Sequence, residues 1–97
     1  MPLNNSKITN MPITAEQFAD AIREILRSAF SEGRGSIAIR AGDLHKQMGD
    51  YPGPDHRMPA CCDAMRSHMI PGDRFITQPP KGDGSNLVVE YMLPRAL

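Results

Sequence analysis

The residues whose types could do chemistry gather between positions 56 and 68 of this 97-residue chain. His56, Cys61, Cys62 and His68 form the spacing H-x4-C-C-x5-H, which matches none of the usual zinc-ligand spacings. A disulfide between the adjacent cysteines would be strained, because neighbouring Cα atoms lie only about 3.8 Å apart. The sequence therefore predicts no metal site. The thiols are either small core residues or a redox sensor at the start of a helix.

No motif of catalysis accompanies these residues. The chain contains no HExxH, no GxSxG and no phosphate-binding P-loop. Asp55, His56 and Cys61 include the residue types of a nucleophilic site, but residues so close in sequence rarely reach the geometry of a triad. The sequence predicts a protein that is not an enzyme and needs no cofactor.

The candidates for contact with DNA are Lys46, Arg57, Arg66, Ser67 and Lys81. Arg57 precedes a predicted helix, whose N-terminus favours anions, and Arg66 could reach a guanine edge. The alternative is that these are ordinary solvated side chains, because 11 basic and 11 acidic residues cancel. Asp63 favours that alternative, since it lies in the centre of the same exposed face and would repel phosphate.

Local signals predict the elements that position these residues. Thr14 and Gln17 fit a capping box at the start of a helix that ends near Glu32, where glycines follow. A short strand at 36–40 runs directly into a helix at 41–48, which Gly49 ends. Pro59 fits the first turn of a third helix at about 57–69. Strands at 74–78 and 86–93, joined by the loop 79–85, predict a hairpin.

Apolar residues at helical spacing predict the buried face of each helix. In the first helix these are Phe18, Ile22, Ile25, Leu26, Ala29 and Phe30, and in the second they are Ala41, Leu44, His45 and Met48. In the third helix Met58, Cys61, Cys62, Met65 and Met69 form the buried stripe, while Ala60, Asp63, Ala64 and Ser67 form the exposed face.

The organisation of the chain predicts one α+β domain. Residues 1–12 are polar, contain two prolines and are expected to form a flexible N-terminal tail, and residues 13–97 to form the domain. The first residues carry no secretory-signal pattern, and no apolar run reaches membrane-spanning length. Reduced cysteines are typical of the cytosol, so we expect a cytoplasmic protein without a membrane partner.

The order helix, strand, helix, helix and hairpin resembles the winged helix-turn-helix superfamily over about residues 14–93. The resemblance implies that the third helix enters the major groove of DNA and that the hairpin tip, residues 79–85, contacts the backbone or minor groove as a wing. One feature departs from the family. The connection from Gly49 to His56 is longer than the usual 3–4 residues and contains two prolines.

A second resemblance covers the string LHKQMGDYPGPDHRMPACCDAM and the later PPKGDG. These residues look similar to a small bacterial domain associated with HNH-type nucleases. That resemblance implies a DNA-reading accessory of a nuclease, not the catalyst itself.

Two functions therefore compete. The first is a DNA-binding winged-helix domain of bacterial type, regulatory or accessory to a nuclease or mobile-element system. The second is a protein-interaction module on the same fold, which would use the small residues of the third helix or the open edge of the hairpin. DNA binding requires a basic stripe that joins Arg57, Arg66 and Lys81, whereas an interaction module would show an apolar patch there.

Overall fold

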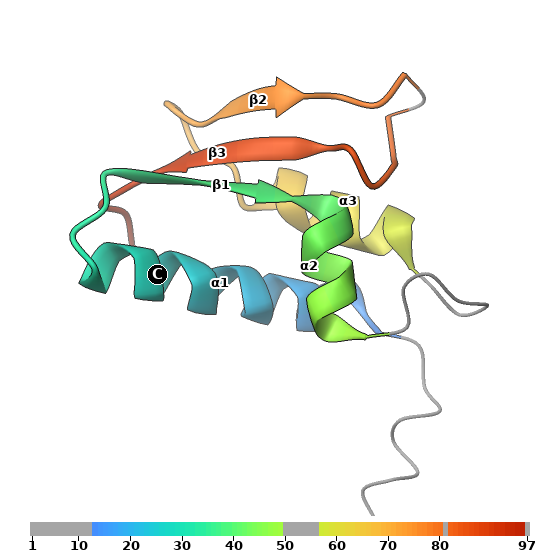
Figure 1. Cartoon of the computed structure of the whole chain (residues 1–97), viewed down its shortest axis with the longest axis horizontal. Coiled ribbons are helices and arrows are strands. Elements are labelled where there is room, and N and C mark those ends of the chain that lie inside the picture. Colours follow the sequence, from blue (N-terminus) through green and yellow to red (C-terminus); the bar gives the residue numbers. More distant parts are fainter. Residues whose placement is uncertain (1–12, 50–56, 81, 97) are drawn as a thin grey trace, which may run out of the picture.

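A computed structural model describes residues 13–49, 57–80 and 82–96 of the chain. The element order is α1 (Ala15–Ser31), β1 (Ser36–Arg40), α2 (Ala41–Met48), α3 (Met58–Ser67), β2 (Arg74–Thr77) and β3 (Val88–Met92). The predicted α+β class is confirmed. Figure 1 shows the sheet along one side of the molecule and α1 along the other, with α2 and α3 at the same end. The predicted tail at 1–12 lies outside the described residues.

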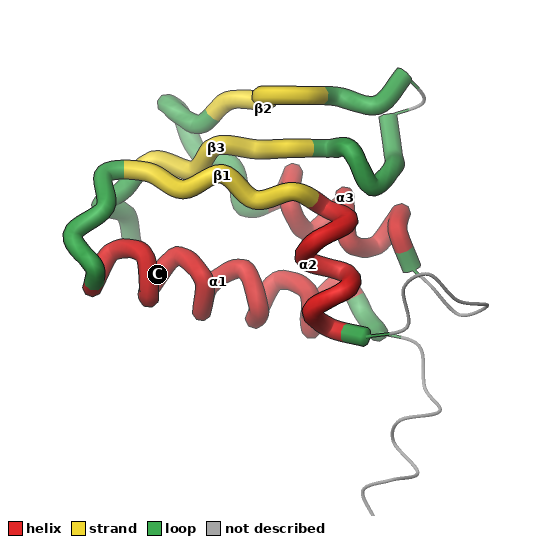
Figure 2. Tube along the Cα trace, in the orientation of Figure 1, coloured by secondary structure: helices red, strands yellow, loops and turns green. Residues whose placement is uncertain are grey.

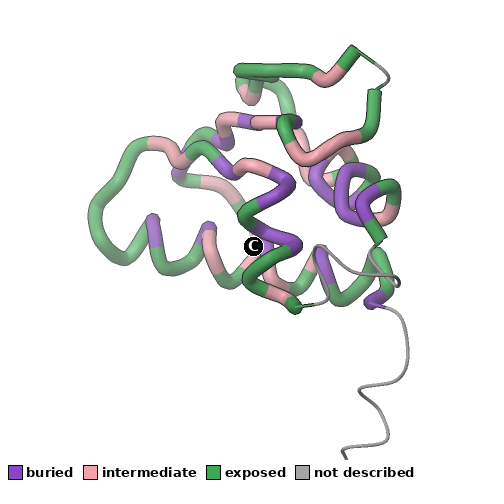
Figure 3. The backbone as a smooth tube through the Cα atoms, turned by 45° about the vertical axis from the view of Figure 1, so that its right-hand side comes forward, coloured by how far each residue is buried: buried purple, intermediate pink, exposed green. Residues whose placement is uncertain are grey.

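The sheet has three antiparallel strands in the order β1-β3-β2 (Figure 2). The predicted hairpin between β2 and β3 is confirmed, and the short strand β1 pairs with the other side of β3. Side chains alternate along β3: Val89 and Tyr91 point into the core, and Glu90 lies on the open face beside Arg74 and Ser36. Every residue of β2 is exposed, as the upper edge in Figure 3 shows.

The start and end of α1 agree with the sequence signals. The Thr14 hydroxyl accepts from the backbone N–H of Gln17 at 3.1 Å, and the Gln17 side chain accepts from the Thr14 N–H at 2.8 Å. At the other end Gly33 has φ 83°, and the N–H of Arg34 reaches back to the carbonyl of Ala29. This is the hydrogen-bond pattern of a Schellman motif, which requires a residue such as glycine at the left-handed position.

Two residues of the predicted α1 stripe lie less deeply than expected. Phe30 is 53 % exposed, which makes its predicted burial wrong, and Ile25 is only half-buried. The positions at the centre of the stripe, such as Ile22 and Leu26, are fully buried. Each residue turns a helix by about 100°, so Phe30 and Ile25 fall on opposite borders of the stripe.

The predicted exposed face of α3 needs two corrections, the smaller of which is Ala60, half-buried against the core. Ala64 is 3 % exposed and belongs to the core, because α3 packs against both other helices and its contact surface is wider than one stripe. The helix is also shorter than the predicted 57–69: His68 is its C-cap, and half-buried Met69 follows it. The four other stripe residues, Met58, Cys61, Cys62 and Met65, are buried as predicted.

The loop before β3 packs tightly on the first turn of α2. The N–H of Gly42 donates to the carbonyl of Ser85 at 2.9 Å, and Ala41 donates to Leu87 at 2.8 Å. A Cβ atom added at Gly42 would lie 2.9 Å from the Ser85 Cβ and 3.1 Å from the Ser85 carbonyl oxygen. The glycine therefore permits the close approach of the loop.

A buried ion pair joins the end of α3 to the sheet. Arg95 donates to both carboxylate oxygens of Asp73, and the two side chains are 4 % and 0 % exposed. The carboxylate also accepts the backbone N–H groups of Ile70 and Met92, at 2.9 and 2.8 Å. Burial raises the pKa of Asp73, but the two N–H donors and Arg95 outweigh it and hold that pKa below its usual value.

Gly42→Ala should destabilise the protein, although alanine normally favours a helix over glycine. The new methyl group would collide with Ser85, and we expect a loss of about 1–3 kcal/mol in the free energy of unfolding. Urea denaturation would measure this loss. Gly35→Ala is the matched control, because a Cβ at Gly35 meets nothing within 4 Å. Equal effects of the two changes would contradict the steric explanation.

Asp73→Asn should remove about 3 kcal/mol or more of stability, because Arg95 would remain buried without its counter-charge. The native pKa of Asp73 is lowered, so its contribution is complete above the unfolded value of about 4 and is lost as pH falls through the native pKa. Urea denaturation between pH 7 and pH 2 should therefore show a steeper acid loss in the wild type than in Asp73→Asn. Asp63→Asn, at an exposed ion pair, should keep the wild-type slope.

Candidate nucleic-acid interface

Arg57 lies at the start of α3, where its backbone is held by a buried histidine. Its N–H donates to Nε2 of His45 at 2.7 Å, so the ring hydrogen of His45 lies on Nδ1, which donates to the carbonyl of Gly49 at 3.2 Å. The ring also packs on Phe18, with 5.0 Å between ring centroids. The prediction that His45 is a core histidine is confirmed.

This contact brings two of the DNA candidates to one end of the molecule. Lys46 follows His45 in α2, and both Lys46 and Arg57 are exposed. Within residues 13–49, 57–80 and 82–96 neither side chain forms an ion pair. Arg57 does not cap α3 through its side chain.

Arg66 bonds the loop between β2 and β3. Its guanidinium bonds Asp63 at 2.8 Å, Asp83 at 2.5 Å and the carbonyl of Gly82 at 3.0 Å. Two carboxylates against one cation leave this cluster with a net charge of −1. Arg66 therefore fastens the loop to α3, and a phosphate would have to displace two aspartates to reach it.

The remaining two candidates contribute less to a DNA surface. The hydroxyl of Ser67 donates to the carbonyl of Asp63 at 2.8 Å, so its hydrogen is used within α3. Lys81 lies outside the described residues. The described part of the chain thus places Lys46 and Arg57 at the same end of the molecule, whereas Arg66 lies among two aspartates.

The sequence patterns did not predict the contact between Asp83 and Arg66. Asp83 belongs to the loop 79–85, whose lysine and glycines predict contact with DNA. An acidic residue in a wing that should meet DNA was a signal against that interpretation. Nothing in the sequence indicated that the loop folds back on α3, where the Cys62 thiol lies 3.6 Å from the carbonyl of Gly84.

Both cysteines are buried and reduced, as the core interpretation requires. Burial, and then the neighbouring Cys62, raises the pKa of Cys61 to about 12. Burial also raises the pKa of Cys62, against a smaller lowering by its hydrogen bond to Gly84. A reactive thiol needs the opposite shift. In the described parts of the chain, no three His, Cys, Asp or Glu residues are grouped so that they could hold a metal ion.

Large exposed apolar side chains gather away from α3. Four of the five in the described residues lie on β2, on the turn before it or at the adjoining end of β3: Ile70, Phe75, Ile76 and Met92. The fifth is Phe30 on α1. No apolar patch therefore replaces the expected basic stripe on the exposed face of α3 itself.

Comparisons of the chain with models of known protein families, with curated proteins and with solved structures find no match. None of the three described helices is both long and apolar enough to cross a membrane.

The two thiols should react slowly with an alkylating reagent in the native protein, because burial keeps them protonated and out of reach. Mass spectrometry over time would follow the reaction of each thiol, with Cys61→Ala and Cys62→Ala separating the two. Denaturing urea should make both react at the rate of a free thiol. Fast native reaction at neutral pH would support the redox-sensor interpretation.

Proposed function

We propose that the chain is a winged-helix domain that binds DNA. The element order and the sheet order β1-β3-β2, with the short strand beside the hairpin, support the resemblance on which this proposal rests. In this proposal α3 is the helix presented to the major groove, and the loop between β2 and β3 is the wing.

One observation carries the proposal. Lys46 and Arg57 are exposed cations without an ion pair in the described residues; Arg57 is the N-cap of α3, and its bond to His45 holds the end of α2, which carries Lys46, near that helix start. A helix N-terminus favours the negative charge of a phosphate, and two cations beside it add to that attraction. Contact through this end would leave the cluster around Arg66 outside the phosphate path.

The charges also limit the strength of binding. Asp63 follows Arg57 in α3, and Asp83 lies in the loop between β2 and β3 that contacts this helix. The whole chain has no net charge. Affinity should accordingly be low, with few phosphate contacts. In this proposal the domain is regulatory, or an accessory that reads DNA for a bacterial nuclease or mobile-element system.

A protein-interaction module is the second candidate. The observation that favours it is the gathering of Ile70, Phe75, Ile76 and Met92 around the open strand β2. Exposed apolar side chains at a sheet edge are more typical of contact with protein than with DNA. A domain without any DNA affinity would leave this candidate as the better one.

The DNA proposal predicts a shallow salt dependence. Binding of a labelled random duplex, followed by fluorescence anisotropy from low to physiological salt, should show a log–log slope of about 0.9 per phosphate contact. Arg57→Ala and Lys46→Ala should each weaken binding to all duplexes and reduce the slope by about one unit. Arg34→Ala is the control, because Arg34 is an exposed cation in the turn after α1.

Two further variants separate a contact at the helix end from one in its middle. Arg66→Ala should leave the slope unchanged, because Arg66 makes no phosphate contact in this proposal, although the two aspartates left without a counter-charge should weaken binding. Asp63→Asn should tighten binding by removing a negative charge. If the wild type binds no duplex at low salt and Asp63→Asn reveals no binding, the DNA proposal fails. It also fails if Arg34→Ala reduces the slope as much as Arg57→Ala.

A further inference from the structure

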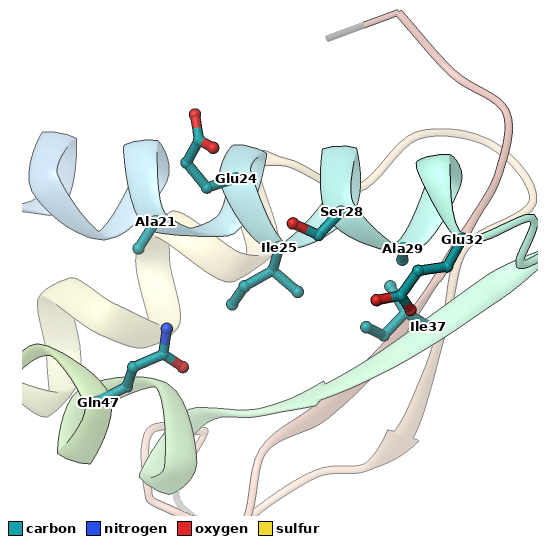
Figure 4. Close-up of a pocket in the computed structure, with 8 residues that line it drawn as sticks. All are labelled: Ala21, Glu24, Ile25, Ser28, Ala29, Glu32, Ile37 and Gln47. Carbon is teal, nitrogen blue, oxygen red and sulfur yellow. The ribbon is translucent and has the colours of Figure 1, made fainter.

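A groove runs between α1, β1 and α2, on the side of the sheet opposite β2 (Figure 4). Its larger part has a volume of about 460 Å³ and is lined by α1, by Ile37 of β1 and by Gln47 of α2. A second part of about 200 Å³ shares Ile25, Ile37 and Gln47 with the first and continues it toward Arg40. The two parts form one groove along β1.

The groove lies against the edge of β1. Its second part touches the four consecutive strand residues from Ile37 to Arg40. Successive side chains of a strand point to opposite faces of a sheet, so a cavity on one face would touch only every second residue. Contact with consecutive residues places this part of the groove beside the strand, along its open edge.

The hydrogen-bond register shows which backbone groups face that edge. The N–H of Leu93 donates to the carbonyl of Gly35, and the N–H of Ala41 donates to the carbonyl of Leu87. The backbone groups of residues 35 and 41 therefore point toward β3. Bonding alternates with a period of two in an antiparallel pair. Ser36 and Ala38 therefore direct their N–H and carbonyl groups away from β3, along the edge that the groove follows. Arg40 directs its N–H the same way, while its carbonyl begins the helix α2.

The walls of the groove are apolar, and one end is negative. Ile25 and Ile37 are half-buried, and Figure 4 shows Ile25 and Gln47 directed into the space. Glu24 points away from β1 in the same view and bonds Arg27, and Asp43 is neutralised by Arg40.

Glu32 supplies the negative charge at this end of the groove. It lines the groove and has no ion pair in the described residues. It also caps the C-terminus of α1, whose last turn contains no basic residue and whose dipole adds negative charge.

We propose that this groove binds an extended peptide segment of a partner protein, which adds to β1 as a fourth strand. The outward backbone groups of Ser36 and Ala38 would bond the segment, an apolar side chain would lie between Ile25 and Ile37, and a lysine or arginine would lie beside Glu32. Each feature selects one part of the ligand: the open edge selects an extended backbone, the two isoleucines an apolar residue, and the carboxylate a cation.

The opposite edge of the sheet is less suited to this role. The register between β2 and β3 shifts between Phe75 and Thr77, so Ile76 is an extra residue in the pairing. Such a bulge twists an edge strand and interrupts regular pairing with another chain. β1 has five residues in regular register and no bulge.

The test uses the full chain and the synthetic peptide Gly-Ser-Lys-Val-Ile-Val-Arg-Ser-Gly, titrated into isotopically labelled protein and followed by NMR. Amide shifts should concentrate at residues 36–40 and on the side chains of Ile25 and Ile37. The N–H groups of Ser36 and Ala38 should exchange more slowly with solvent in the complex, because the added strand would cover them. A peptide with glutamate at both basic positions should bind more weakly, and one with proline in place of isoleucine should not bind.

Variants of the protein test the charge and the edge separately. Glu32→Lys should weaken the peptide about five- to tenfold, since it removes one favourable charge pair and adds a repulsion. Glu16→Lys is the matched control at the other end of α1 and should leave affinity unchanged. Ala38→Pro removes an outward N–H that β3 does not use and should abolish binding. If Ala38→Pro does not fold, the Glu32 comparison still decides.

Four results would overturn the proposal, three of them with the peptide and one without it. The first is the absence of shifts at millimolar peptide, and the second is a set of shifts centred on β2 or α3. The third is an equal effect of Glu32→Lys and Glu16→Lys. Self-association of the chain through β1, detected as a concentration-dependent loss of the same amide signals without peptide, would assign the groove to a second copy and also overturn it.

Discussion

The buried ion pair between Asp73 and Arg95 is the constraint on which the arrangement of α3 and the sheet depends. Asp73 accepts N–H groups from the turn after α3 and from the end of β3, while Arg95 also reaches the carbonyl of His68. Arg95 lies over the ring of Tyr91, whose hydroxyl donates to the carbonyl of Met65 in α3. One pair of charges therefore fixes the end of a helix, the start of β2 and the end of β3.

Sequence reasoning succeeded where the deciding contacts are local. The capping box of Thr14 and Gln17, the glycine that ends α1 and the proline in the first turn of α3 all act within a few residues of themselves. It failed where partners are distant in sequence. Ala64 is buried because other helices cover it, and Arg66 is neutralised by Asp83, 17 positions away. No periodicity within α3 contains that information.

The charged and apolar surfaces of the domain lie in separate places. Among the described residues, the α2–α3 end offers cations without an ion pair, the middle of α3 carries two aspartates, and the edge of β1 combines apolar side chains with the carboxylate of Glu32, which also has no ion pair. A chain with no net charge can thus present regions of opposite preference without either one dominating its long-range field. Ligands of different chemistry would meet different parts of this domain and would not compete for one surface.

His45 holds the end of α2 and the start of α3 together. One ring nitrogen bonds the residue that ends α2 and the other bonds the first residue before α3, so a single side chain fixes both ends of the segment 50–56. The entropy of closing a loop grows slowly with its length, by about 0.6 kcal/mol per doubling. Residues could be inserted or exchanged between Gly49 and Arg57 at small cost while α3 keeps its place. The domain could thereby acquire a new binding specificity without rebuilding its core.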